Sequence, residues 1–103
     1  MLSGVFAARG SEKSATQFLR FYENGYVIAC TIAGVANAPS WFDWSHEGVQ
    51  RGRYELQGEA LWFETFSPAG SVVYRGRVSG PTIELSSVSL INGFEQTLRF
   101  DAL

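Results

Sequence analysis

Cysteine is almost absent from this chain of 103 residues, in which Cys30 stands alone. A single cysteine excludes an internal disulfide, and the simplest expectation is a reducing compartment, the cytoplasm. Its place in an apolar stretch favours an inert core thiol over a nucleophile.

Charge and long apolar runs are also scarce. Charged residues make up 17% of the chain, the formal net charge is -2, and no like charges cluster. Such a chain has no general attraction to nucleic acid or to anionic lipid, so we expect neither partner. The first residues lack the basic end and apolar run of a signal peptide, and no later segment approaches membrane-spanning length. We therefore expect a soluble, unprocessed protein.

The residues of catalytic and metal sites are few. His46 is the single histidine, and its neighbours Asp43, Ser45 and Glu47 fall in a predicted loop, where capping and solvation account for them. The ligands of a zinc site are not clustered, and no glycine-rich loop opens a helix to bind phosphate. We predict no catalytic residues, no metal and no cofactor, and hence a protein that is not an enzyme.

What the chain does have is apolar alternation between glycine turns. Hydrophobic residues make up 46% of it and aromatic residues 15%, and residues 54–85 alternate as an antiparallel meander with one buried face. One domain over residues 1–103 is expected at this length. Turns at Gln57-Gly58, Ser67–Gly70 and Ser79-Gly80 put the apolar residues of this run on one face. The predicted pairs are Tyr54 with Leu61, Phe63 with Tyr74, Leu61 with Gly76, and Tyr74 with Leu85.

Two further hairpins are predicted at Asn24-Gly25 and Asn92-Gly93, which are preferred type I′ turn pairs. The first pairs Phe21 with Ile28 and Leu19 with Cys30, and the second pairs Ser87 with Leu98 and Leu85 with Phe100. With a strand over residues 2–9, the chain is all-β. We predict a small antiparallel up-and-down barrel, or a strongly curled meander, of about eight strands. A short helix or ordered loop around residues 41–44 lies between the third and fourth strands.

The pattern Gly-x-Tyr-x-Leu-x-Gly-x-x-Leu-x-Phe over residues 52–63, followed by Val-x-Tyr-x-Gly-x-Val-x-Gly-x-x-Ile-x-Leu over residues 72–85, resembles the meander of small bacterial lipocalin-like, or calycin-type, proteins. The resemblance implies a β-barrel. Barrels of about eight strands are either filled by their own side chains or hold one small ligand.

Three polar residues share the parity of the core near one end of the predicted barrel: Ser87, Ser89 and Gln96. Buried hydroxyls and amides need hydrogen-bond partners, which a ligand or solvent at the barrel mouth would supply. We predict a ligand site lined by Ser87, Ser89, Gln96, Trp41 and Trp44. A core filled by its own side chains is the alternative.

The outward face carries the second candidate site. The predicted register places Arg53, Trp62, Arg75 and Glu84 in one row, and tryptophan and arginine often anchor interfaces. A structural ladder on a wet face explains the same row. The alternative to ligand binding is therefore a non-catalytic module for protein interaction or homo-oligomerisation. Its predicted surface comprises Phe18, Tyr22, Arg53, Trp62, Phe66 and Arg75.

Overall fold

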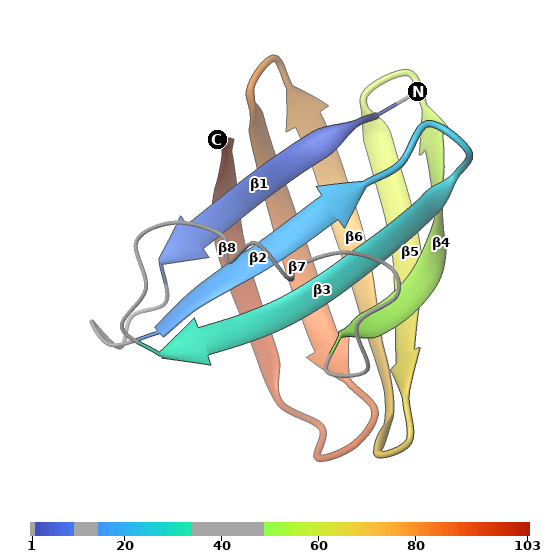
Figure 1. The fold of residues 1–103 in the computed structure, drawn as a ribbon, viewed down its shortest axis with the longest axis vertical. Coiled ribbons are helices and arrows are strands. Elements are labelled where there is room, and N and C mark those ends of the chain that lie inside the picture. The colour runs from blue at the N-terminus through green and yellow to red at the C-terminus, as the bar shows by residue number, and fades with distance from the viewer. Residues whose placement is uncertain (1, 10–14, 34–48) are drawn as a thin grey trace.

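The computed structural model describes residues 2–9, 15–33 and 49–103. In these residues it shows a closed barrel in which each strand pairs antiparallel with the next and the last pairs with the first (Figure 1). The all-β barrel prediction is confirmed, whereas the predicted helix or loop at residues 41–44 lies outside the described residues. The strands are β1 (Gly4–Arg9), β2 (Ala15–Phe21), β3 (Tyr26–Ala33), β4 (Gln50–Gln57), β5 (Ala60–Ser67), β6 (Gly70–Ser79), β7 (Thr82–Ser89) and β8 (Glu95–Ala102).

The described part of the chain contains no helix, and so no helix that could cross a membrane.

In the meander, the side chains predicted to face inward do so. The register between β5 and β6 is as predicted, and the registers between β4 and β5 and between β6 and β7 are shifted. Phe63 pairs with Tyr74 across β5 and β6, as predicted. Tyr54 pairs with Phe63 and not with Leu61, and Tyr74 pairs with Ser87 and not with Leu85. A shift of two residues keeps every side chain on its face, because side chains in a strand alternate with a period of two.

The shifts arise because two turns are centred one residue later than predicted. The central residues are Gly58-Glu59 and Gly80-Pro81, and both glycines have φ of 61°. A type II′ turn needs positive φ only at its first central position, so glycine stands there and an ordinary residue follows. Proline, whose φ is fixed near -65°, fits the second position.

The last hairpin is also shifted by two residues. Leu85 pairs with Leu98 and Ser87 pairs with Gln96, where the sequence predicted Phe100 and Leu98 as the partners. A loop of residues 90–93 replaces the predicted two-residue turn, since Ser89 N donates to Phe94 O at 2.9 Å. The inward faces of β7 and β8 are nevertheless as predicted.

The hairpin between β2 and β3 contradicts the prediction. Tyr22 N donates to Tyr26 O at 2.8 Å, and Gly25 N donates to Tyr22 O at 3.1 Å. With Gly25 at a φ of 93°, this is a three-residue loop in which a type I turn is followed by a left-handed glycine. An odd number of loop residues moves the register by one and therefore inverts the faces of β3.

The inversion places different β3 residues in the core. Phe21 pairs with Val27 and Leu19 with Ala29, so Val27 and Ala29 point into the barrel. The predicted inward residues Ile28 and Cys30 lie on the outer side instead, where Ile28 packs with Phe18 and Val49. Phe18 is fully buried in this outer cluster, which corrects its predicted place on an exposed surface.

Aromatic residues fill the end of the barrel that carries the β2–β3, β4–β5 and β6–β7 turns. The ring of Phe21 meets Phe6, Tyr54 and Phe63 edge to face, with centroid distances of 5.6, 5.2 and 5.6 Å. The Tyr54 hydroxyl lies 2.8 Å from the carbonyl oxygens of both Leu2 and Tyr22, which share its single proton. It thus ties the first residues to the β2–β3 turn.

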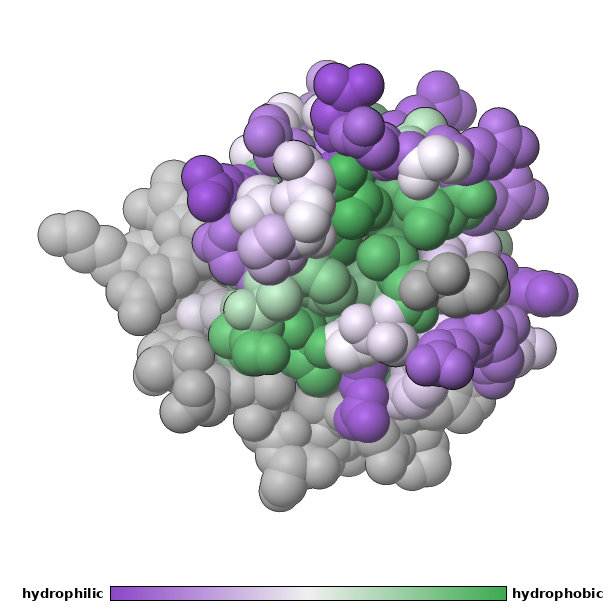
Figure 2. Space-filling model, turned by 90° about the horizontal axis from the view of Figure 1, so that it is seen from above, coloured by the Kyte–Doolittle hydropathy of each residue, from purple (hydrophilic) through white to green (hydrophobic). Residues whose placement is uncertain are grey.

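Figure 2 views this turn end from above and shows apolar residues at its centre with hydrophilic ones around them.

The outer wall carries cross-strand pairs that differ in part from the predicted row. Trp62 faces Arg75, as predicted, but Arg53 faces Glu64, and Glu84 lies between Arg77 and Arg99. The two-residue register shifts explain these changes. The predicted row of Arg53, Trp62, Arg75 and Glu84 is therefore wrong as a single row.

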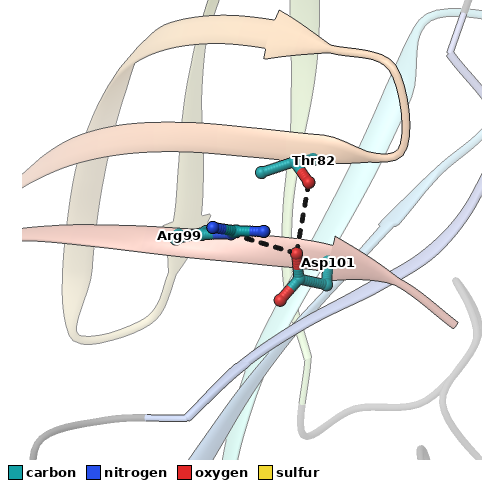
Figure 3. A network of polar contacts seen from close by, with 3 residues as sticks. All are labelled: Thr82, Arg99 and Asp101. Atoms are coloured by element: carbon teal, nitrogen blue, oxygen red, sulfur yellow. Dashed lines mark hydrogen bonds and ion pairs between the residues drawn. The ribbon is translucent and has the colours of Figure 1, made fainter.

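One polar group on this wall joins β7 and β8 (Figure 3). Arg99 Nε and Thr82 Oγ1 both donate to Asp101 Oδ1 at 3.2 Å. The ion pair between Arg99 and Asp101 is exposed, so we expect it to contribute at most about 1 kcal/mol.

Two strand glycines mark places where neighbouring backbones come close. A Cβ on Gly52 would overlap the carbonyl oxygen of Glu64, and one on Gly76 would overlap that of Glu84. Glycines in strand interiors commonly allow the bends that close a small barrel.

We predict that Gly76→Ala lowers the free energy of unfolding by at least about 3 kcal/mol, the upper end of the cost of overpacking. Gly58→Ala is the control, because a Cβ there meets no other atom within 4 Å and only the φ of 61° is unfavourable. Its expected cost is about 1–2 kcal/mol. Urea unfolding measures both, and equal losses would contradict a close approach at Gly76.

Candidate binding site at the barrel mouth

A cavity of about 270 Å³ opens at the end of the barrel opposite to the aromatic cluster, bordered mainly by inward residues and also by Phe18 and Cys30 of the outer side. This mouth carries the β5–β6 turn and the β7–β8 loop, at the bottom of Figure 1. Strands β2, β3, β4, β6, β7 and β8 contribute to its wall. The lining residues are Gln17, Phe18, Leu19, Ala29, Cys30, Thr31, Gln50, Val72, Tyr74, Ser87, Ser89, Phe94 and Gln96.

One inward row of residues connects the two ends of the barrel. Neighbouring strands pair Gln96 with Ser87, Ser87 with Tyr74, Tyr74 with Phe63, and Phe63 with Tyr54. Because the strands of a barrel tilt, a row of pairs that crosses them climbs along the barrel axis. The row begins with an amide and a hydroxyl at the mouth and ends among the aromatic rings of the turn end.

A buried hydrogen-bonded chain forms part of the cavity wall. Thr65 is fully buried and its Oγ1 donates to Gln50 Oε1 at 2.9 Å. The Tyr74 hydroxyl is hydrogen-bonded to Thr65, and its ring stacks on Phe63 with centroids 4.5 Å apart. These contacts fix the Gln50 oxygen, so the amide nitrogen of Gln50 is the group left to donate to a ligand.

Burial raises the pKa of Tyr74 from 10.0 to about 12, although the hydrogen bond with Thr65 acts in the opposite direction. Burial and the nearby Glu23 carboxylate also raise the pKa of Tyr54, against the hydrogen bond to Leu2. Both hydroxyls are therefore neutral at physiological pH.

The loop of residues 90–93 holds the rim of the mouth. Leu90 N donates to Ser71 O at 2.8 Å, which joins the loop to β6. Gly93 N donates to Ser89 O at 2.7 Å, and Ile91 N donates to Ser89 Oγ at 3.3 Å. The Ser89 hydroxyl therefore orders the loop while keeping its own proton available to donate.

The described lining of the cavity carries no charged side chain. Its polar groups are the amides of Gln17, Gln50 and Gln96 and the hydroxyls of Thr31, Tyr74, Ser87 and Ser89. Cys30 also borders the cavity, but burial raises the pKa of its thiol from 9.0 to about 11, so the thiol is neutral. The described part of the site thus offers hydrogen-bond donors and acceptors without a net charge.

The structure brings together the three strand residues of the predicted ligand site. Ser87, Ser89 and Gln96 line one cavity, and Ser87 is buried. Trp41 and Trp44 lie outside the described residues. That any of them contacts a ligand stays a prediction.

Sequence reasoning missed several polar residues of the mouth. Gln17 shares the parity of Leu19 and Phe21, and this signal was present in the sequence. Thr31 shares the parity of Val27 and Ala29, a face of β3 that the predicted turn at Asn24-Gly25 turns outward and the observed register turns inward. No sequence pattern predicts the hydrogen bond from Thr65 to Gln50. It joins the adjacent strands β5 and β4 at residues 15 apart in the chain.

The described residues contain no cluster of three or more histidine, cysteine, aspartate or glutamate side chains that could hold a metal. His46 lies outside these residues. Every fully buried side-chain polar atom among them has a hydrogen-bond partner, so the groups open to a ligand are the partly exposed ones at the mouth.

The predicted outer surface is divided by the fold. Phe18 is buried, and Tyr22 is half-buried with the Arg20 guanidinium 5.2 Å from its ring centre. Trp62 and Phe66 are exposed and line a separate groove with Arg53, whereas Arg75 borders a different depression beside Trp62. The six predicted residues therefore do not form one contiguous patch.

The described residues form a small closed β-barrel with a cavity at one end, and the described lining of this cavity carries no charged side chain. Comparisons of the chain with protein-family models, with curated proteins and with solved structures gave no match.

We predict that stability falls as pH rises from about 10 toward 12, because burial raises the pKa of Tyr74 and Tyr54, and that the raised pKa of Cys30 starts the fall near pH 9. Below pH 10 the tyrosines are protonated in both the folded and the unfolded chain, so they contribute no pH dependence to the free energy of unfolding. Between pH 10 and 12 the unfolded chain releases the Tyr74 proton while the folded chain keeps it. One such proton costs about 1.4 kcal/mol per pH unit.

Tyr74→Phe should reduce the slope of stability against pH between pH 10 and 12 by up to about 1.4 kcal/mol per pH unit. Tyr22→Phe, which changes a tyrosine on the outer side, is the control. Urea unfolding at several alkaline pH values measures the slopes. Identical slopes for the wild type and Tyr74→Phe would refute a buried, protonated Tyr74.

Proposed function

We propose that this protein is a non-catalytic binding protein whose barrel mouth holds a small, neutral, partly apolar molecule. The observation that carries the proposal is the lining of the mouth cavity. Seven uncharged side chains with an amide or hydroxyl group border it, together with apolar surface from Leu19, Ala29, Val72 and Phe94. Ligand sites commonly combine apolar walls with a few convergent polar groups in this way.

The size of the cavity supports a small ligand. Its volume of about 270 Å³ corresponds to about nine water molecules at the volume they occupy in the liquid. Sites for drug-sized ligands begin at about 300 Å³. A single ring or a short alkyl chain with one polar group fits this space.

The chemistry of the lining supports a neutral ligand. A charged group transferred from water into the cavity would find no opposite charge in the described lining, and an unpaired buried charge is costly. Amide side chains both donate and accept hydrogen bonds. A neutral amide, alcohol or carbonyl compound is the complementary class.

The barrel architecture and the absence of catalytic groups in the described lining agree with a binding role. A closed barrel of eight strands is the size that holds one small ligand in lipocalin-like proteins, the class that the sequence resembles. Ser87 and Ser89 have no histidine, carboxylate or lysine beside them in the described lining. Activation of a serine nucleophile requires such a base.

The test compares three probes that share one ring and differ in charge: benzamide, benzoate and benzylamine. Each is titrated into isotopically labelled protein while backbone and glutamine side-chain amide resonances are followed by NMR. We expect benzamide to shift the resonances of Gln17, Gln50 and Gln96, with much weaker binding of the charged probes.

Gln96→Met removes the amide at nearly constant shape and should weaken benzamide binding about fivefold, the equivalent of about 1 kcal/mol for one hydrogen bond. Thr97→Val, at the adjacent outward position of β8, is the matched control and should leave binding unchanged. Preferred binding of a charged probe, or shifts confined to the outer wall, would rule out this proposal.

A further inference from the structure

The outer wall over β3, β4 and β5 carries a groove that is separate from the mouth. Its volume is about 320 Å³. Trp62 and Phe66, which are 39% and 57% exposed, are among the few large apolar side chains exposed in the described residues. The groove is lined by Tyr26, Arg51, Gly52, Arg53, Trp62, Glu64 and Phe66.

The register of β4 and β5 arranges the groove in rows. The outward cross-strand pairs are Arg51 with Phe66, Arg53 with Glu64, and Glu55 with Trp62. The Arg53 guanidinium lies 5.3 Å from the ring centre of Tyr26, and no ion pair among the described residues joins it to Glu64. The central row thus presents one positive and one negative charge, flanked by two aromatic rings.

We propose that this groove binds the same groove of a second copy of the chain. A symmetric dimer requires a self-complementary surface, in which residue i meets residue j and j meets i. A twofold axis that runs between β4 and β5, parallel to the strands, would place each residue over the equivalent of its cross-strand partner. Arg53 then faces Glu64 of the second copy, and Arg51 faces Phe66 of the second copy.

Charge complementarity favours a second copy over a wholly acidic or a wholly basic partner. A wholly acidic partner would approach Glu64, and a wholly basic one would approach Arg53, each at the cost of like-charge contact. A second copy satisfies both charges at once. The exposed tryptophan and the arginines are residue types that anchor interfaces, and Arg51 over an aromatic ring adds a cation–π contact.

The curvature of the barrel limits the contact to these few strands, so we expect a weak dimer in the micromolar range, typical of small interfaces. This dimer does not involve the mouth cavity, and its failure would leave the proposed ligand site untouched.

The test uses opposite charge reversals, Arg53→Glu and Glu64→Arg. Each single variant puts two like-charge contacts into its own dimer, and we expect dimerisation about tenfold weaker or worse. Mixing the two variants puts opposite charges into both contacts of a mixed dimer, so association should return. The double variant R53E/E64R should likewise dimerise as the wild type does.

Sedimentation velocity from low micromolar to near millimolar concentration measures each association. Arg77→Glu and Glu84→Arg, exposed outward positions outside the groove lining, are the matched controls and should dimerise normally. Circular dichroism verifies that every variant is folded. A wild-type chain that stays monomeric over this range, or a mixture and double variant that both fail to restore association, would overturn the proposal.

Discussion

The barrel depends on two places where neighbouring strands come closer than a side chain would allow. At Gly52 and Gly76 the backbones of Glu64 and Glu84 occupy the space of a Cβ. A side chain at either position would push the paired strands apart, and we infer that these close approaches help the sheet to close where β8 meets β1. Once the sheet is closed, it has no free edges. All inward side chains then share one interior. The division of that interior into a packed end and a polar end follows from this closure.

The two ends differ because the row of inward pairs from Gln96 to Tyr54 changes chemistry along its length. At the turn end, aromatic rings meet edge to face and Tyr54 ties down the first residues. At the mouth, smaller hydroxyl and amide side chains leave a cavity that bulky rings would have filled. Tyr74 and Thr65 lie between the two regions and are hydrogen-bonded to each other, and Thr65 also donates to Gln50. The packed end consists of aromatic rings in mutual contact, and the polar end carries the hydrogen-bonding groups on which the proposed ligand site depends.

The chemistry of each turn decides whether the sequence predicts the strand register and the inward faces correctly. Alternation in residues 54–85 determined which side chains face inward, and errors of two residues at Gly58 and Gly80 did not alter the faces. At Gly25 the error was one residue, so Ile28 and Cys30 were assigned to the wrong side. Asn-Gly suits a two-residue turn, but the same glycine also suits the left-handed position of a three-residue loop. Local sequence does not separate these two turns, because the choice depends on which register buries more of β3.

The sequence by itself determined the fold class, the inward faces of the strands from β4 onward, and the shared parity of Ser87, Ser89 and Gln96. These properties follow from the period-two alternation of a strand, which is local. Only the tertiary structure decided that Gln17, Thr31 and Gln50 join those residues around one cavity, that Phe18 is buried, and that Arg53 lies beside Glu64. Those facts depend on register and on closure of the barrel, and both are settled by contacts between residues far apart in the chain.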